Sequence, residues 1–191
     1  MIYLKTINEI FANPVGALMK AKKEKNIEKT LIILVVDWVL LALSFLLVGS
    51  NFLYVYFMAM MIFSLGITGS IFVALLAKFV FNILGGKGGY FEALTPLAYS
   101  ELPISVGFLL AGIISLIPYI GMILTVVPIA IFAALGIPTF YRGIKEMFGL
   151  DMITTLVGIS ILAGVMIISF YASMLLYGLS SPNLISLLMR A

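Results

Sequence analysis

The sequence predicts an all-α protein, a polytopic bundle of five transmembrane helices preceded by short interfacial amphipathic helices. Of its 191 residues, 63% are hydrophobic and 10% are charged, whereas a soluble domain is about 25% charged. Three stretches of about forty residues contain no Asp, Glu, Lys or Arg: 38–77, 102–141 and 152–189. One membrane-spanning helix needs about twenty apolar residues, so a stretch of about forty is as long as a helical hairpin.

Residues 1–30 are expected to form a cytoplasmic segment at the membrane interface. Over 2–12 the apolar and charged side chains separate onto opposite helical faces, and the segment is too short to span. Asn13 and Pro14 predict an N-cap and the first residue of a second helix. A basic cluster follows, which either holds anionic headgroups or only fixes the orientation of the first span. The cluster comprises Lys20, Lys22, Lys23, Lys25 and Lys29.

The remaining residues, 31–191, are expected to form one transmembrane domain. Its spans are predicted at about 31–48, 52–84, 96–117, 120–141 and 152–177. Uncharged turns at 49–51 and 118–119 join the members of the first two hairpins, and a glycine-rich loop (85–89) and a charged loop (142–151) connect the other spans. A short apolar tail follows, in which 184–190 either dips back into the membrane surface or does not.

The distribution of Lys and Arg predicts the orientation in the cell membrane. The N-terminal segment, the 85–95 segment and the 142–151 loop carry nearly all of these residues, whereas the two uncharged turns carry none. Basic segments face the cytoplasm, so five spans place the N-terminus inside and the C-terminus outside.

Three ionisable residues fall inside the predicted spans, each roughly 10 Å below the cytoplasmic surface at 1.5 Å per helical residue. They are Asp37, Lys78 and Glu101. Because charges at this depth usually pair or face an aqueous cavity, we expect an Asp37–Lys78 ion pair with Glu101 nearby. In the alternative interpretation, Lys78 extends to the interface and Glu101 caps the start of the third span.

Two prolines and one pair of small residues bear on helix packing. Pro128 lies within the fourth span and is expected to kink it, while Pro103 is expected in the first turn of the third span. Mid-span prolines occur at transporter hinges and in static bundles alike, and the static interpretation is preferred here. Gly66 and Ser70, four residues apart, let helices approach closely, in internal packing or in a dimer.

Several chemistries lack their usual residues. With no Cys and no His, the chain has no thiolate and lacks the commonest general base and transition-metal ligand. The glycine-rich loop has Gly88 after Lys87, where a phosphate-binding P-loop needs Ser or Thr. We therefore expect no catalytic residues, no metal, no cofactor and no nucleic-acid partner.

The segment from Leu84 to Pro103 resembles the entry to the third span of the Yip domain family, five-span proteins named for interaction with Ypt/Rab GTPases. The resemblance rests on these residues: Gly85, Gly86, Lys87, Gly88, Gly89, Tyr90, Tyr99 and Pro103. Asn13-Pro14 and the segment 141–149 are also similar in placement to short prokaryotic members. Eukaryotic members act in vesicle traffic and bind GTPases through a long acidic, aromatic-rich N-terminal region. Residues 1–30 lack that character, which weakens the case for a small-GTPase partner.

The sequence therefore favours a non-catalytic membrane protein of Yip type. The expected role is membrane organisation, scaffolding or a trafficking-like function, through contacts with other membrane proteins or with further copies of this chain. The alternative is a component of a small-solute or ion permease that uses a polar cluster of Asp37, Lys78 and Glu101. A permease requires a wet cavity that reaches this cluster, whereas a scaffold packs it dry.

Overall fold

The computed structural model describes residues 2–48 and 52–179, and within these residues all regular structure is helical. Five helical segments are long and apolar enough to cross a membrane, which confirms the predicted fold class. The turn at 49–51 and the tail at 184–190 lie outside the described residues. The helices are α1 (Ile2–Ala12), α2 (Pro14–Glu24), α3 (Ile27–Val48), α4 (Phe52–Ile83), α5 (Tyr90–Ser115), α6 (Gly121–Leu124), α7 (Val126–Phe148) and α8 (Met152–Leu179).

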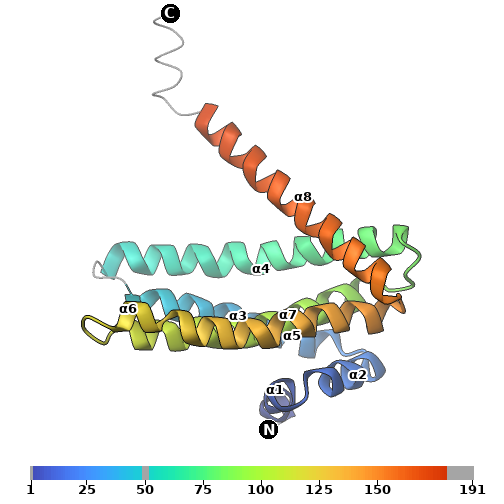
Figure 1. Ribbon diagram of the computed structural model, residues 1–191, viewed down its shortest axis with the longest axis horizontal. Helices are drawn as coiled ribbons and strands as arrows, with labels where there is room; N and C mark the ends of the chain where they lie inside the picture. Colours follow the sequence, from blue (N-terminus) through green and yellow to red (C-terminus); the bar gives the residue numbers. More distant parts are fainter. Residues whose placement is uncertain (1, 49–51, 180–191) are drawn as a thin grey trace, which may run out of the picture.

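Helix α5 occupies the centre of the bundle. It runs beside α3, α4 and α7 (Figure 1), and it contacts all three. Glycines permit the close approach, because a Cβ on Gly136 of α7 would lie 2.6 Å from the carbonyl oxygen of Ser100 in α5. On the other side, a Cβ on Gly112 of α5 would lie 3.0 Å from the carbonyl oxygen of Ser44 in α3. Small residues therefore bring neighbouring backbones into contact, as is typical of helix packing in membranes.

The N-terminal helices α1 and α2 pack along the flank of α5 and α7 (Figure 1). The sequence predicted that their apolar faces lie against the lipid interface. In the structure, however, Ile10 and Leu18 are buried in the main hydrophobic core of the protein. The ring of Phe11 meets the edge of Phe132 in α7, with centroids 6.1 Å apart. The predicted cap is confirmed, since Asn13 accepts a hydrogen bond from the Gly16 amide at 3.0 Å, with Pro14 as the first helical residue.

Two helices extend beyond the predicted spans. The sequence also predicts a short helix over 90–99 that enters the third span, and the structure joins the two into α5, which begins at Tyr90. Helix α7 continues to Phe148 through most of the expected 142–151 loop. Apolar residues explain the extension of α7, since Ile144, Met147 and Phe148 recur at helical spacing and are buried. Gly149, with φ of 67°, then ends the helix in the left-handed conformation that favours glycine.

The prolines also sit differently from the prediction. Pro103 lies well inside α5 instead of in its first turn, because the helix starts at Tyr90. Pro128 lies in the first turn of α7, immediately after the interruption at Thr125 that separates α6 from α7. A proline has no N–H to donate to the carbonyl four residues earlier, here that of Leu124. The expected kink in the fourth span is thus an interruption one turn before Pro128.

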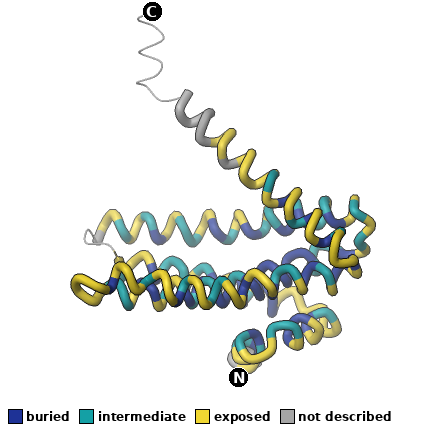
Figure 2. Tube along the Cα trace, viewed as in Figure 1, coloured by how far each residue is buried: buried dark blue, intermediate teal, exposed yellow. Residues whose placement is uncertain are grey.

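Helix α8 leans away from the other long helices (Figure 1). Its first half crosses the end of α4, where the ring of Phe81 fills the space beside Gly158. Beyond Leu162, which is buried, the described side chains of α8 are largely exposed (Figure 2). Figure 2 shows the contrast with α5, whose residues are mostly buried.

Candidate functional site

A layer of polar side chains lies inside the bundle, where α3, α4 and α5 meet. Asp37 of α3 is 1% exposed, and its Oδ1 accepts a hydrogen bond from the Ser105 hydroxyl of α5. On α4, the Ser70 hydroxyl donates to Glu101 Oε2 at 3.1 Å and accepts from Trp38 Nε1 at 3.0 Å. We call these five residues the carboxyl layer.

Helical spacing explains why these residues meet. Glu101 and Ser105 are four residues apart and therefore share one face of α5. That face brings Glu101 beside Asp37, and the two carboxyl groups interact. Gly66, one turn before Ser70, leaves room for the Trp38 indole, because a Cβ there would lie 2.0 Å from Trp38 Cε3. Gly66 and Ser70 thus serve internal packing between α3 and α4.

Lys78 is not part of this layer. It is half-buried on α4 and makes no ion pair or hydrogen bond with the described residues. Ser70 is the α4 residue beside Trp38, and Lys78 lies eight residues further along, about 12 Å at 1.5 Å per residue. The expected Asp37–Lys78 ion pair therefore does not form, and the carboxyl groups accept hydrogen bonds from the hydroxyls of Ser105 and Ser70.

Sequence reasoning missed the neutral members of the layer and a second buried contact. Thr30 of α3 and Thr95 of α5 join their hydroxyls at 3.2 Å, and both residues are buried. Ser105 could have been predicted as a member of the layer, because it lies one helical turn from Glu101. The pairings of Trp38 with Ser70 and of Thr30 with Thr95 cross between helices, and no spacing within one helix reports them.

The arrangement of the carboxyl layer fits a structural role better than a catalytic or ligand-binding one. Every buried side-chain nitrogen or oxygen in the described part of the chain has a hydrogen-bond partner, so none of these buried polar groups lacks a partner that a ligand would have to supply. The same residues contain no group of three Asp or Glu side chains able to hold a metal ion. What the carboxyl layer can do is fix α3, α4 and α5 in register, since polar groups inside a membrane bundle must find partners.

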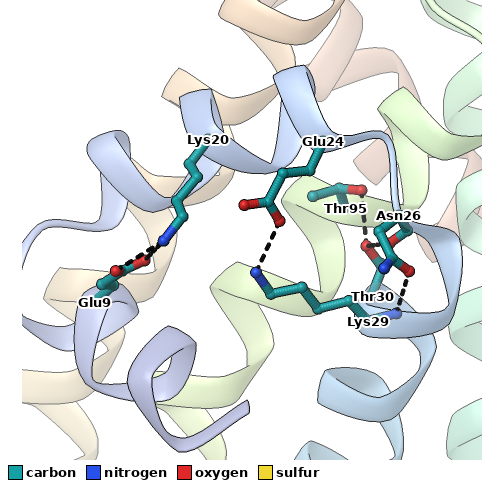
Figure 3. A network of polar contacts seen from close by, with 7 residues as sticks. All are labelled: Glu9, Lys20, Glu24, Asn26, Lys29, Thr30 and Thr95. Atoms are coloured by element: carbon teal, nitrogen blue, oxygen red, sulfur yellow. Dashed lines mark hydrogen bonds and ion pairs between the residues drawn. The ribbon is translucent and has the colours of Figure 1, made fainter. Parts of the chain in front are cut away.

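The predicted basic cluster is largely paired within the protein, and Figure 3 shows the pairs of Lys20 and Lys29. Lys20 Nζ lies 2.9 Å from Glu9 Oε1 and thereby joins α2 to α1. This partner lowers the pKa of Glu9 and raises the pKa of Lys20. Lys29 is buried, and its Nζ lies 2.9 Å from Glu24 Oε2.

The other three lysines differ in their surroundings. Lys25 Nζ lies 3.5 Å from Glu92 Oε1 at the start of α5. Lys22 Nζ donates to the backbone carbonyl of Glu146 near the end of α7. Lys23 is exposed and has no partner among the described residues. Most of the cluster therefore ties α2 to the rest of the protein.

The family-like segment 85–103 forms the loop between α4 and α5 and the first half of α5. The loop is pressed onto Phe148, because a Cβ on Gly88 would lie 2.6 Å from its ring, and the Lys87 amide donates to the Phe148 carbonyl at 3.1 Å. Gly85 adopts φ of 92°, and Gly89 precedes α5 and donates to Glu92 Oε2 at 2.9 Å. Further along α5, Tyr90 is half-buried, whereas Tyr99 and Pro103 are buried.

Fold and site together define a class: multi-pass helical membrane proteins with an internal polar layer. The family model for the Yip1 domain matches residues 9–174, so the chain belongs to the Yip1 domain family. This match confirms the resemblance based on residues 84–103. Neither the search of the curated proteins nor the search of the solved structures finds a match.

Proposed function

We propose that this protein is a non-catalytic organiser of the membrane, which holds other membrane proteins or further copies of itself through helix contacts. The observation that carries the proposal is the packing of the carboxyl layer. Asp37 is 1% exposed and bonded to Ser105, and Glu101 is bonded to Ser70. A rigid, internally satisfied bundle of this kind presents its outer helices as fixed surfaces.

Helix α8 is the surface that we assign to this role. Its second half leans out of the bundle and leaves Ile167 and Ile168 with 56% and 70% of their surface exposed. Ser160 and Gly164 form a small-residue pair four apart on the same helix, and nothing in the described chain comes within 4 Å of a Cβ on Gly164. Small residues at this spacing allow a second helix to approach closely.

We further propose that the chain resides in the cell membrane with its N-terminus in the cytoplasm. Support comes from Lys and Arg, which gather at the end of the bundle formed by 20–29, 84–92 and 142–151. We call this the basic end, and basic segments prefer the cytoplasmic side. Lys23, exposed and unpaired in the described structure, is the member of the predicted cluster best placed to meet anionic headgroups.

The permease alternative gains no support from three pockets in the described part of the chain. Two pockets in the apolar part of the bundle have volumes of about 230 and 270 Å³. The first lies between α3 and α4 and the second between α3, α5 and the α6–α7 segment, and neither is lined by Asp37, Lys78 or Glu101. A third pocket lies at the basic end, away from all three residues. A solute pathway through the carboxyl layer would need a cavity that reaches it.

Site-specific photocrosslinking in native membranes tests the proposal. A photoreactive residue replaces Ile168 of α8, and the matched control replaces Ile137 of α7, which is 66% exposed. Both positions carry isoleucine and similar exposure, so lipid contact alone affects them equally. We expect discrete protein adducts from position 168, identified by mass spectrometry as one or a few membrane proteins or as this chain. The same background from both positions would count against the proposal.

A further inference from the structure

The basic end contains a pocket that differs in chemistry from the two apolar ones. Its volume is about 390 Å³, far more than the roughly 30 Å³ that one water occupies in the liquid. Its polar wall carries Lys22, Lys25, Lys87 and Glu92, and Met147 and Phe148 form an apolar wall. The residues come from the end of α2, the 85–89 loop, the start of α5 and the end of α7.

The charge in this pocket is predominantly positive. Three ammonium groups face one carboxylate, and Glu92 already accepts from the Gly89 amide at 2.9 Å and lies 3.5 Å from Lys25 Nζ. Lys22 meets only a neutral group, the carbonyl of Glu146. The side chain of Lys87 has no partner among the described residues. Lys22 and Lys87 therefore carry positive charges that pair with no carboxylate in the described part of the chain.

The fold fixes the backbone at two of these lysines, Lys25 and Lys87. Lys25 ends α2 in the left-handed conformation, with φ of 48°, and its amide donates to the Ala21 carbonyl at 2.8 Å. Lys87 is fixed by its neighbours, because Gly86 and Gly88 both lie against Phe148 and leave no space for a side chain. Gly86 and Gly88 thus hold the backbone of Lys87 at a pocket that Lys22 and Lys25 also line.

We propose that this pocket binds a phosphate group. Ammonium groups converging from separate elements match a compact anion with several oxygens. The wall formed by Met147 and Phe148 suits a carbon chain attached to that phosphate. Anionic phospholipid headgroups and soluble phosphate monoesters offer the same chemistry. The inference does not rest on the proposed scaffolding function, since a phosphate can bind whether or not α8 contacts another protein.

Binding to the purified full-length chain in detergent tests this proposal by isothermal titration calorimetry. The probes are a short-chain phosphatidic acid, glycerol 3-phosphate and a short-chain phosphatidylcholine as the zwitterionic comparison. The decisive variant is Lys87→Gln, because this side chain makes no hydrogen bond or ion pair with the described residues that the substitution would remove. The matched control is Lys23→Gln, which removes the same charge from the neighbouring helix but not from the pocket.

We expect at least one phosphate monoester probe to bind more tightly than phosphatidylcholine. Lys87→Gln should weaken that binding about fivefold or more, the effect of losing one cation near an anion, and Lys23→Gln should change it less than twofold. Binding of phosphatidic acid alone identifies a headgroup site, and binding of glycerol 3-phosphate as well identifies a site for soluble esters too. Equal losses in both variants, or no preference over phosphatidylcholine, would overturn the proposal.

Discussion

Helices α5 and α8 belong to one membrane protein but differ in how much of their surface packs against the rest of it. In the most apolar stretch of α5, 56% of the residues are buried within the protein, against 18% in that of α8. Helix α5 supplies Glu101 and Ser105 to the carboxyl layer, whereas α8 is held mainly near its start, where Gly158 meets Phe81. Composition does not separate them, since both are long apolar helices.

The difference shows that lipid solubility and internal packing are separate properties of a membrane helix. Hydrophobicity inserts both helices, but only close backbone approach and shared polar partners join a helix to the bundle. A helix that has neither within its own chain keeps its surface available. In the proposed function, α5 therefore contributes to the stability of the protein and α8 to its contacts with other proteins.

The strongest test of this contrast introduces the same valine into each region. Gly136→Val should destabilise the protein by about 3 kcal/mol, because its side chain would meet the α5 backbone at Ser100 and overpack the contact. Gly164→Val should change the free energy of unfolding by less than about 0.5 kcal/mol, because its site is open. The single tryptophan, Trp38, reports unfolding by its fluorescence in an SDS titration.

Replacing glycine by valine changes helix propensity by a similar amount at both positions, so the difference between the variants isolates packing. Equal destabilisation by the two valines would mean that α8 is as tightly joined to the bundle as α5. In the crosslinking experiment, the Gly164 variant should also lose adducts from position 168 while remaining folded.

The second test addresses the carboxyl layer. Asp37→Leu should cost about 1–3 kcal/mol, because the buried hydroxyl of Ser105 loses its partner. Lys78→Leu should stay within about 0.5 kcal/mol, since Lys78 has no partner among the described residues. The measurement is the thermal unfolding midpoint of each purified variant. It is taken from the loss of the monodisperse chromatography peak as the sample is heated.

A charge swap sharpens this second test. Asp37→Lys should destabilise, because the longer lysine side chain has no room at a position that is 1% exposed, and adding Lys78→Asp should not restore the folded fraction. Restoration by the double variant would show that Asp37 and Lys78 pair after all and would reinstate the ion pair predicted from the sequence.

The sequence was a sufficient guide to which segments are helical but not to which faces meet. Charge-free stretches predict long apolar helices, and the Asn13-Pro14 cap is a local signal. The structure confirms both, with five helices able to cross a membrane and the Asn13 side chain bonded to the Gly16 amide. The Asp37–Lys78 pairing was inferred from equal depths counted from the span ends. That count fails because α4 has 32 residues, about 48 Å at 1.5 Å per residue, and so exceeds a bilayer core of about 30 Å. The end of α4 therefore does not mark the membrane surface.

The apolar faces of α1 and α2 show a second limit of the same kind. An amphipathic helix has the same pattern whether its apolar face meets lipid or protein. Only the structure shows that the apolar face of α2 meets protein, because Leu18 packs beside Gly143 of α7. For the carboxyl layer, the sequence located Asp37 and Glu101 through their charge but gave no sign of Trp38 or Ser70, whose hydrogen bond crosses between helices.

The smallest expected effect concerns the start of α8. Asp151 accepts hydrogen bonds from the Thr154 amide at 2.9 Å and from the Thr154 hydroxyl at 2.7 Å, and these bonds lower the pKa of Asp151. Because the folded pKa lies below the unfolded value of about 3.9, the contribution to stability is complete above that value. It is lost as the pH falls through the lowered pKa.

Hydrogen exchange of peptides covering the first turns of α8 measures this loss locally. The wild-type chain should lose protection there below about pH 4, while Asp151→Asn should keep a pH-independent cap, since asparagine caps helices about as well as aspartate. Asp151→Ala should be less protected at every pH, and peptides of α5 should be unaffected in all three proteins. If acid releases α5 and α8 together, then the start of α8 is part of the cooperative bundle, and the independence of α8 is confined to its second half.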